Sequence, residues 1–238
     1  MILKRKIYKK LLEWKKECQG KKALLIEGAR RIGKSTICEE FGKSEYKSFL
    51  LIDFAKKDKE VEGYFEKYLN DLDTFFMLLQ THFGTKLTER NSLIIFDEVQ
   101  MFPQARAAIK YLVADGRYDY IETGSLISIR ENVKNIVIPS EERHINMYPL
   151  DFEEFAIALE EDLLVEYIKK CFEKREPLER SMHNQAMLLF HQYMLVGGMP
   201  MSVVTFIESK KDFTEADREK RDILKLYRET SYEKSTIN

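Results

Sequence analysis

The chain contains little cysteine, proline or glycine, and it lacks the long apolar runs of a membrane-spanning segment. Its 238 residues include 3 Cys, 5 Pro and 10 Gly, and the cysteines Cys18, Cys38 and Cys171 lie far apart. An odd number of widely spaced cysteines fits neither a disulfide framework nor a zinc site. Apolar stretches such as 93–96 are much shorter than the roughly 18–20 residues that cross a membrane. We therefore expect a globular protein of a reducing, cytoplasmic compartment, with no membrane segment.

The chain also lacks a net charge of either sign, since 39 Lys and Arg oppose 40 Asp and Glu. This balance gives no overall case for binding to nucleic acid or to a membrane surface. Residues 1–22 are the exception, with nine Lys or Arg against two Glu. Two interpretations of this segment stay open: the solvent-exposed face of a basic helix, or contact with an acidic partner or nucleic acid.

Hydrophobic residues are plentiful, at 44% of the chain, and they include 15 Phe and 12 Tyr. From residue 23 to 150, short apolar runs alternate with amphipathic segments. This alternation predicts an α/β fold with a parallel sheet of about five strands flanked by helices. The strands are predicted at 23–26, 48–54, 93–99, 118–123 and 145–148, and the helices at 6–18, 34–41, 64–79 and 104–114.

The character of the chain changes near residue 150. Beyond that point no strand pattern stands out, and the apolar spacing is that of helices. The predicted helices span 151–162, 163–174, 179–196, 201–209 and 215–230. We therefore predict two domains, an α/β domain at 1–150 and a small all-α module at 151–238.

A complete phosphate-binding motif follows the first predicted strand. The sequence GARRIGKS at 28–35 matches G-x-x-x-x-G-K-[ST] between an apolar strand and a helix, which is the context that the motif requires. Its glycines let backbone N–H groups curl around phosphate oxygens at the positive end of the helix. Lys34 is predicted to contact the β- and γ-phosphates, and the Ser35 hydroxyl to ligate Mg²⁺. The predicted nucleotide-binding residues are Gly28, Ala29, Arg30, Arg31, Ile32, Gly33, Lys34, Ser35 and Thr36.

Two carboxylates end the predicted strand LIIFDEV at 93–99. Ligands of parallel α/β sheets bind at the carboxyl ends of the strands, so this acidic pair and the phosphate loop are expected to converge. Asp97 is predicted to hold Mg²⁺, and Glu98 to act as the general base that activates water. After the next strand, the sequence TGS offers a hydroxyl that senses the γ-phosphate; Ser125 is the catalytic candidate and Thr123 the alternative.

These motifs resemble the additional-strand, catalytic-glutamate branch of P-loop NTPases, which includes AAA-type ATPases. The strings GARRIGKST, LIIFDEVQ, IETGSLISIR, MYPLDFEEF and YMLVGGMP occur in the order found in a prokaryotic family of AAA-family ATP-binding proteins. The resemblance spans residues 7–230, nearly the whole chain, and implies a P-loop ATPase that uses ATP with Mg²⁺. An N-K-x-D motif for guanine is absent, in agreement with ATP. Family members carry a further C-terminal domain, often nuclease-like, which we expect this chain to lack.

The sequence GGMP at 197–200 is similar to the G-x-P turn of signal-transducing NTPases, whose proline packs near adenine. That similarity makes Pro200 a candidate nucleotide contact in the helical module. The alternative is a helix stop made by glycine and proline. The sequence does not single out an arginine finger, and the candidates for that role are Arg106, Arg117, Arg130 and Arg143.

Taken as a whole, the motifs predict a Mg-dependent ATPase in which hydrolysis moves the helical module. Two alternatives stay open. One is a nucleotide-gated switch that acts through a partner with negligible hydrolysis. The other is a nucleic-acid-associated ATPase fragment, suggested by the DEVQ string and the basic N-terminus. The partner is likewise left open among a protein, a second copy of this chain and nucleic acid.

Overall fold

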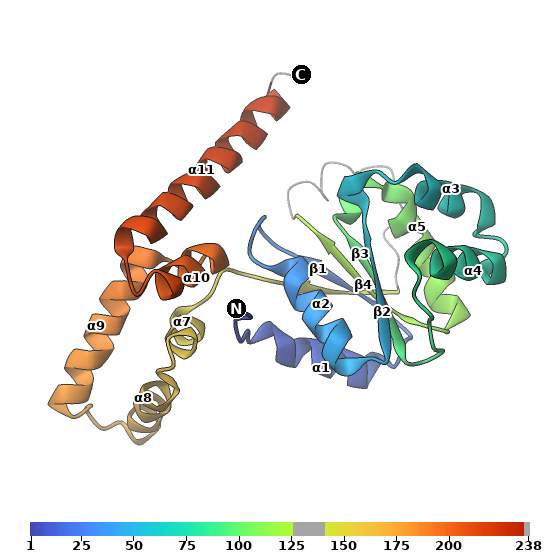
Figure 1. The fold of residues 1–238 in the computed structure, drawn as a ribbon. Coiled ribbons are helices and arrows are strands. Elements are labelled where there is room, and N and C mark those ends of the chain that lie inside the picture. The colour runs from blue at the N-terminus through green and yellow to red at the C-terminus, as the bar shows by residue number, and fades with distance from the viewer. Residues whose placement is uncertain (126–140, 236–238) are drawn as a thin grey trace. The chain divides into compact units, whose positions relative to one another are not determined.

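The computed structural model describes residues 1–125 and 141–235, with side chains described through residue 228 within these ranges. The chain divides into two compact units (Figure 1). Ile7–Met147 form an α/β unit, and Met1–Lys6 together with Tyr148–Asn238 form a helical unit. The chain therefore passes between the two units twice, once after Lys6 and once after Met147.

The described part of the α/β unit contains a five-stranded, fully parallel sheet. Its strand order is β2-β3-β4-β1-β5, which places β1 and β4 side by side near the centre. The prediction of a parallel α/β sheet followed by a helical part is confirmed. The strands are β1 (Ala23–Glu27), β2 (Ser48–Asp53), β3 (Ser92–Asp97), β4 (Asp119–Gly124) and β5 (Glu142–Asn146).

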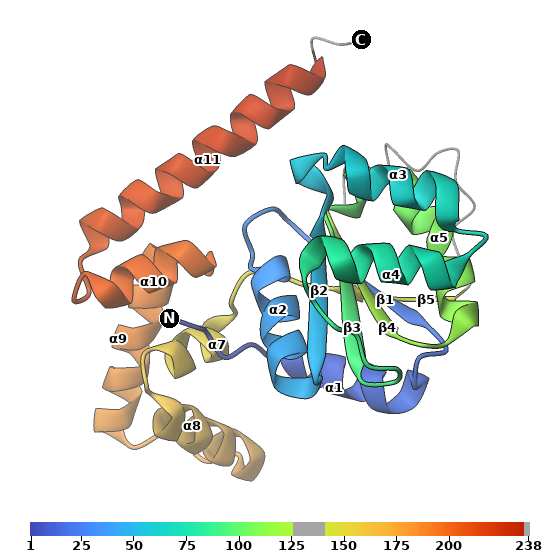
Figure 2. The ribbon, with the colours of Figure 1, turned by 45° about the vertical axis from the view of Figure 1, so that its right-hand side comes forward.

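Helices cover both faces of this sheet. α3, α4 and α5 lie on one face (Figure 2), where Leu25, Phe75 and Phe96 belong to a single apolar core. α1 and α2 lie on the other face and pack through Trp14 and Phe41, whose rings are 6.5 Å apart. The helices are α1 (Ile7–Cys18), α2 (Lys34–Glu45), α3 (Lys59–Tyr68), α4 (Leu72–Phe83) and α5 (Pro103–Asp115), with short 3-10 turns at η1 (Phe54–Lys56) and η2 (Val99–Met101).

The prediction of one long helix at 64–79 is wrong, because this segment contributes to both α3 and α4. Asp71 breaks the helix. Its side chain accepts hydrogen bonds from Thr74 N at 3.2 Å and Thr74 Oγ1 at 2.6 Å, and so caps a new helix. Phe65 of α3 and Phe75 of α4 pack edge to face with their centroids 5.0 Å apart. The aromatic residues kept a helical spacing because both helices bury them in the same core.

The last strand also differs from its prediction, since β5 covers Glu142–Asn146 rather than 145–148. β5 lies at the edge of the sheet and pairs only with β1. Most of its side chains are exposed or half-buried. An edge strand of this kind lacks the apolar run that marks a central parallel strand, so hydropathy places it poorly.

The helical unit is built from five described helices, as the apolar spacing predicted. Its core includes Phe155, Leu189 and Phe206. No single described helix is long and apolar enough to span a membrane, although α9 and α10, bent by 118° at their junction, meet the length and composition criteria as a pair. The helices are α7 (Phe152–Ala158), α8 (Asp162–Lys174), α9 (Arg180–Val196), α10 (Pro200–Glu208) and α11 (Phe213–Ser235).

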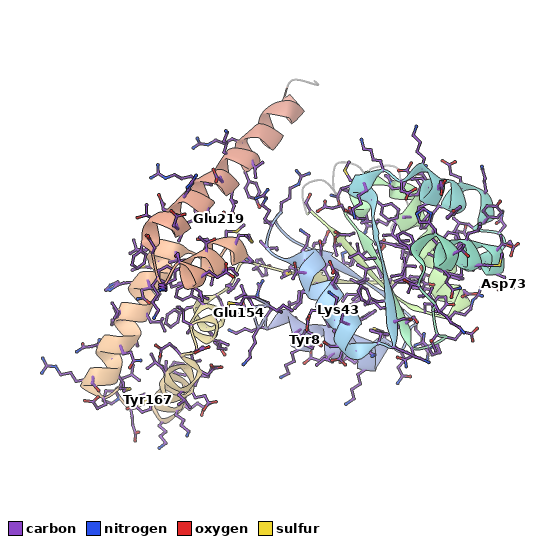
Figure 3. The ribbon with its side chains drawn as sticks, in the orientation of Figure 1. Tyr8, Lys43, Asp73, Glu154, Tyr167 and Glu219 are labelled. Carbon is purple, nitrogen blue, oxygen red and sulfur yellow. The ribbon has the colours of Figure 1, made fainter. Side chains whose placement is uncertain are left out.

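The first six residues are bound into the helical unit by Glu154 of α7, which is labelled in Figure 3. Arg5 Nε lies 3.2 Å from the Glu154 carboxylate, and both side chains are almost fully buried. The backbone N–H of Lys6 donates to the same carboxylate at 2.6 Å. Glu154 also forms a capping box with Asp151 at the start of α7. One carboxylate therefore joins the N-terminal segment to the first helix of this unit.

Side chains of α5, β4 and β5 form a buried ionic cluster on one face of the sheet. Arg106 Nη2 is 2.9 Å from the Glu142 carboxylate. Glu122 of β4 is fully buried in the same cluster. Burial raises the pKa of Glu122 well above its ordinary value, the negative charge of Glu142 raises it further, and Arg106 opposes the shift. Both burial and the neighbouring carboxylate therefore favour the protonated form of Glu122.

This raised pKa predicts how stability depends on pH. The unfolded chain titrates Glu122 near its ordinary pKa of about 4.3, so the folded state binds a proton that the unfolded state releases. The stability that this proton contributes is complete below the unfolded pKa of Glu122. It is lost as the pH rises toward the pKa of Glu122 in the folded protein. Glu122→Gln, which is neutral throughout, should gain stability relative to wild type as the pH rises above the unfolded pKa. Urea unfolding at several pH values measures this, with exposed Glu66→Gln as the control. Identical pH dependence in wild type and Glu122→Gln would contradict the assignment.

Candidate functional site

The phosphate loop (residues 28–35) joins β1 to α2 in the α/β unit. Gly33, the N-cap of α2, has a φ of 89°, and Arg31 has a φ of 63°. These left-handed conformations turn the chain sharply and leave the first amides of α2 directed toward the loop interior. The loop therefore presents backbone N–H groups together with the positive end of a helix, which is a favourable environment for phosphate.

Gly28 packs tightly against the residue that follows β5. A Cβ at position 28 would lie 2.4 Å from the carbonyl oxygen of Met147 and 2.6 Å from Ile32 Cδ1. Met147 is held there because its N–H donates to Glu27 O at 2.8 Å, which continues the β1–β5 pairing. A side chain has no room at this position, so packing requires the first glycine of the motif.

Lys34 is the cation of the site. Its side chain is 5% exposed, and Nζ donates to Ala29 O at 2.8 Å and to Gly28 O at 3.2 Å. Burial lowers the pKa of Lys34, while the nearby carboxylates of Glu98 and Asp97 oppose that shift. The ammonium group thus donates to neutral carbonyls of the loop, and burial disfavours its charge. A bound phosphate would supply a negative charge that stabilises the ammonium.

Two hydroxyl side chains from separate elements contact Asp97, the last residue of β3. Ser35 Oγ of α2 lies 2.8 Å and 2.7 Å from the two Asp97 carboxylate oxygens. Thr123 of β4, which is fully buried, donates its hydroxyl to the same carboxylate. A hydroxyl and a carboxylate in contact are hard oxygen donors of the kind that Mg²⁺ prefers. Ser35 and Asp97 therefore fit the metal-ligating role assigned to them.

Glu98 leaves the strand in a left-handed conformation, with a φ of 52°. β3 consequently ends at Asp97, and the prediction that the strand continues to Val99 is wrong. The Glu98 N–H donates to Thr123 Oγ1 at 3.3 Å, and the Glu98 carboxylate accepts a hydrogen bond from Gln100 Nε2. The sharp turn separates the two acids, since Asp97 is bonded to Ser35 whereas Glu98 is directed to Gln100.

The structure brings Lys34, Ser35, Asp97 and Glu98 together around the loop. Thr123 is the hydroxyl that contacts Asp97, whereas Ser125 is buried just beyond the end of β4. Among the other predicted nucleotide-binding residues, Ile32 is buried, Arg30 and Gly33 are half-buried, and Ala29, Arg31 and Thr36 are exposed. Pro200 belongs to the helical unit, where it is the first residue of α10.

Sequence reasoning missed Gln100 and the bond between Thr123 and Asp97. Gln100 follows the acidic pair in the DEVQ string, so its position was visible but its role was not. The hydrogen bond from Gln100 to the Glu98 carboxylate depends on the left-handed turn at Glu98, and hydropathy contains no signal for that turn. Thr123 was identified only as an alternative sensor, because its contact requires β3 and β4 to be neighbours.

The arginine-finger candidates differ in their surroundings. Arg106 is 2% exposed and paired with Glu142, so it is buried within its own unit. Arg117 and Arg143 each pair with acidic side chains of the α/β unit. Arg130 lies outside the described residues. Burial excludes Arg106 as a group that reaches into another molecule while its pair with Glu142 holds.

A family model described as "AAA domain" matches residues 20–156, which is more than half of the chain. The chain therefore belongs to the AAA domain family, a family of P-loop ATPases. The matched range contains the phosphate loop, the acidic end of β3 and the polar end of β4.

Two solved structures that are similar to this chain are the Orc1 protein of Aeropyrum pernix in complex with DNA and PCH-2 of C. elegans. The alignment with Orc1 has 9% identity and a TM-score of 0.40, and it covers 82% of this chain and 68% of that one. The alignment with PCH-2 has 11% identity and a TM-score of 0.43, covering 90% of this chain and 64% of PCH-2. This chain thus spans less than two thirds of PCH-2. No curated protein matches the sequence.

The packing of Gly28 predicts the effect of a single methyl group. Gly28→Ala should destabilise the protein by about 1–3 kcal/mol, as overpacking does, or displace Met147 and distort the loop. Gly63→Ala is the control, because a Cβ there meets nothing within 4 Å and lies inside α3. That change should stabilise by about 0.5–1 kcal/mol. Chemical denaturation of both variants measures the difference, and equal stabilities would rule out the close approach to Met147.

Proposed function

We propose that this chain binds ATP with Mg²⁺ at the phosphate loop and hydrolyses it. The observation that carries the proposal is the direct contact between the Ser35 hydroxyl and the Asp97 carboxylate, at 2.7 and 2.8 Å, beside the buried Lys34. Membership of the AAA domain family supports a nucleoside triphosphate as the ligand. The absence of a guanine-reading N-K-x-D motif favours ATP over GTP.

Each residue of the site has a role in this proposal. The amides of residues 28–35 bind phosphate oxygens, and the Lys34 ammonium exchanges its loop carbonyls for the β- and γ-phosphates. Ser35 and Asp97 would hold Mg²⁺, which supplies positive charge between the same phosphates when it is bound. Thr123 donates its hydroxyl to the Asp97 carboxylate and holds it in place. The protein's contribution is therefore positioning and charge, as phosphoryl transfer demands.

Glu98 is the proposed general base. It stands one residue beyond the strand end, half-buried, with its N–H held by Thr123. A water placed between Glu98 and the γ-phosphate attacks phosphorus and gives its proton to the Glu98 carboxylate. The bond from phosphorus to the bridging oxygen breaks, and ADP leaves with that electron pair. A base that activates water favours hydrolysis over transfer to a bound acceptor.

Coupling to the helical unit belongs to the same proposal, and the connector at 147–150 is its route. Gly28 of the phosphate loop packs on Met147 at one end of the connector. At the other end, Leu150 N donates to Gly198 O at 2.7 Å, and a Cβ on Gly198 would lie 2.1 Å from Leu150 O. Arg5 Nη2 donates to Tyr148 O at 2.6 Å between them. A nucleotide that shifts the loop would move Met147 and, through the backbone, the Gly-Gly-Met-Pro turn.

Pro200 enters the proposal as the residue that starts α10 directly after this turn. Gly198 is tied to the connector, so any displacement of residues 147–150 reaches the start of α10. The proposed role of Pro200 as a nucleotide contact rests on the similarity to the G-x-P turn. The backbone contact between Gly198 and Leu150 supports the turn as the element that responds to nucleotide.

Two variants test binding and hydrolysis separately. Lys34→Ala should weaken ATP affinity about 10- to 150-fold, since it removes charge-assisted hydrogen bonds to phosphate. Glu98→Gln should bind ATP normally and lose about 100- to 10,000-fold in phosphate release, because only proton abstraction is removed. Equilibrium ATP binding and phosphate release measure both, with Lys43→Ala, an exposed change on α2, as the control.

The outcomes separate the candidate functions. Unchanged ATP binding by Lys34→Ala would overturn the nucleotide site. Binding without turnover in wild type would favour the nucleotide-gated switch. Turnover that requires added DNA or RNA would favour a nucleic-acid-associated ATPase, whereas Glu98-dependent turnover by the purified chain alone identifies an independent ATPase.

The connector gives a further prediction. ATP should change the hydrogen exchange of a peptide spanning 147–150 in the hydrolysis-deficient Glu98→Gln protein, because Leu150 N–H is bonded to Gly198 O. Gly198→Ala forces those backbones apart, so the peptide should exchange quickly and no longer respond to ATP. Both proteins are compared at saturating ATP, so that a lost response does not reflect weaker binding. Gly63→Ala in the same background is the control, and an ATP response that survives Gly198→Ala would contradict this route.

A further inference from the structure

Glu98 is held by one hydrogen bond to its backbone and one to its side chain. The side-chain partner, Gln100, has no role in the proposed function. The Glu98 N–H donates to Thr123 Oγ1 at 3.3 Å, and the Glu98 carboxylate accepts from Gln100 Nε2. We infer that Gln100 is a positioning residue for hydrolysis, whose buried amide aims the Glu98 carboxylate at the attacking water. The inference rests on the proposed function, because it gives Gln100 a task only where Glu98 is the base.

The local fold explains how Gln100 reaches back to Glu98. After the left-handed residue Glu98, the chain forms the 3-10 turn η2 (Val99–Met101). The turn is closed by Met101 N donating to Glu98 O at 2.8 Å. A turn this tight brings the side chain of Gln100 back over Glu98, two residues earlier in the chain. Gln100 is 2% exposed, whereas Glu98 is half-buried, so the donor is the fixed partner and the base is the group that it orients.

The chemistry of an amide suits this task better than that of a charged donor. Gln100 Nε2 donates to Oε2 of Glu98, so Oε1 is the oxygen proposed to take the proton from water. A neutral donor orients the carboxylate without pairing its charge. A lysine or arginine in the same place would form an ion pair that competes with water. A side chain of this length, free to rotate, loses rotamer entropy when it is fixed. The contact with Gln100 fixes Glu98 during folding.

The main experiment uses Gln100→Met, which has a similar shape and no donor. We expect kcat for ATP hydrolysis to fall about 10- to 100-fold, since a misplaced catalytic group costs rates of that order. The Kd for ATP should stay within about twofold, because the Lys34, Ser35 and Asp97 contacts remain. Gln100→Asn keeps the amide but is one methylene shorter, and we expect it to resemble Gln100→Met. Exposed Gln104→Met at the start of α5 is the matched control and should resemble wild type.

A double-mutant cycle separates positioning from general damage. In the Glu98→Gln background, adding Gln100→Met should lower the residual rate by less than about twofold, because the group that Gln100 orients is already disabled. A merely structural role would lower the rate by the same factor in both backgrounds and would lower the thermal midpoint in parallel with activity. Either of these results, or a wild-type kcat in Gln100→Met, would overturn the inference.

A second measurement needs no turnover and uses the nucleotide-free protein. The side-chain amide protons of Gln100, assigned by their loss in Gln100→Met, should exchange slowly with solvent in wild type. In Glu98→Ala, exchange should accelerate at least about tenfold as the acceptor is removed. Unchanged exchange in Glu98→Ala would overturn the contact. The proposed function fails separately, through equal phosphate release by wild type and Glu98→Gln, and that result would leave Gln100 with no base to position.

Discussion

The site depends on the hydrogen bonds that the Asp97 carboxylate accepts. This carboxylate accepts from Ser35 at the start of α2 and from Thr123 at the end of β4. It therefore fastens the phosphate loop, β3 and β4 to one another at the carboxyl edge of the sheet. Asp97 is almost fully buried. A buried carboxylate is tolerated because hydroxyl donors satisfy it. The residue that would ligate a cation is thus also the one that aligns three elements before any cation arrives.

Beyond the sheet, two glycines pack directly against the backbone of residues 147–150. Gly28 leaves no space between the phosphate loop and Met147, and Gly198 leaves none between the Gly-Gly-Met-Pro turn and Leu150. Backbones in contact respond to displacement directly, without the slack of a flexible side chain. A Cβ has no room at either of the two glycines that matter for motion in the proposed mechanism, and the two contact opposite ends of one short connector.

Local patterns in the sequence predicted most of the α/β unit and the core of the site. The phosphate loop, Asp97 and Glu98 follow short apolar runs, and parallel strands bring such strand ends together. The features that the sequence did not predict depend on tertiary contacts or on local backbone turns. Asp71 divides one predicted helix into two, although the aromatic spacing continues across the break. β5 was misplaced because an edge strand has no continuous apolar run. Gln100 was overlooked because its bond follows from a left-handed turn.

The alternation of side chains along β4 places two different polar systems on opposite faces of one strand. Thr123 faces Asp97 and the phosphate loop, whereas its neighbour Glu122 faces the buried pair of Arg106 and Glu142. The first system is a set of hydroxyl–carboxylate bonds that a cation would join. The second is a buried acid with a raised pKa beside an ion pair, shielded from solvent. A shift of β4 by one residue in one direction would place Glu122 against Asp97 and Ile121 in the ionic cluster. A shift in the other direction would place Thr123 in the cluster and Gly124 against Asp97. Both faces therefore enforce the same register, and that register is what presents Thr123 to Asp97 and to the N–H of Glu98.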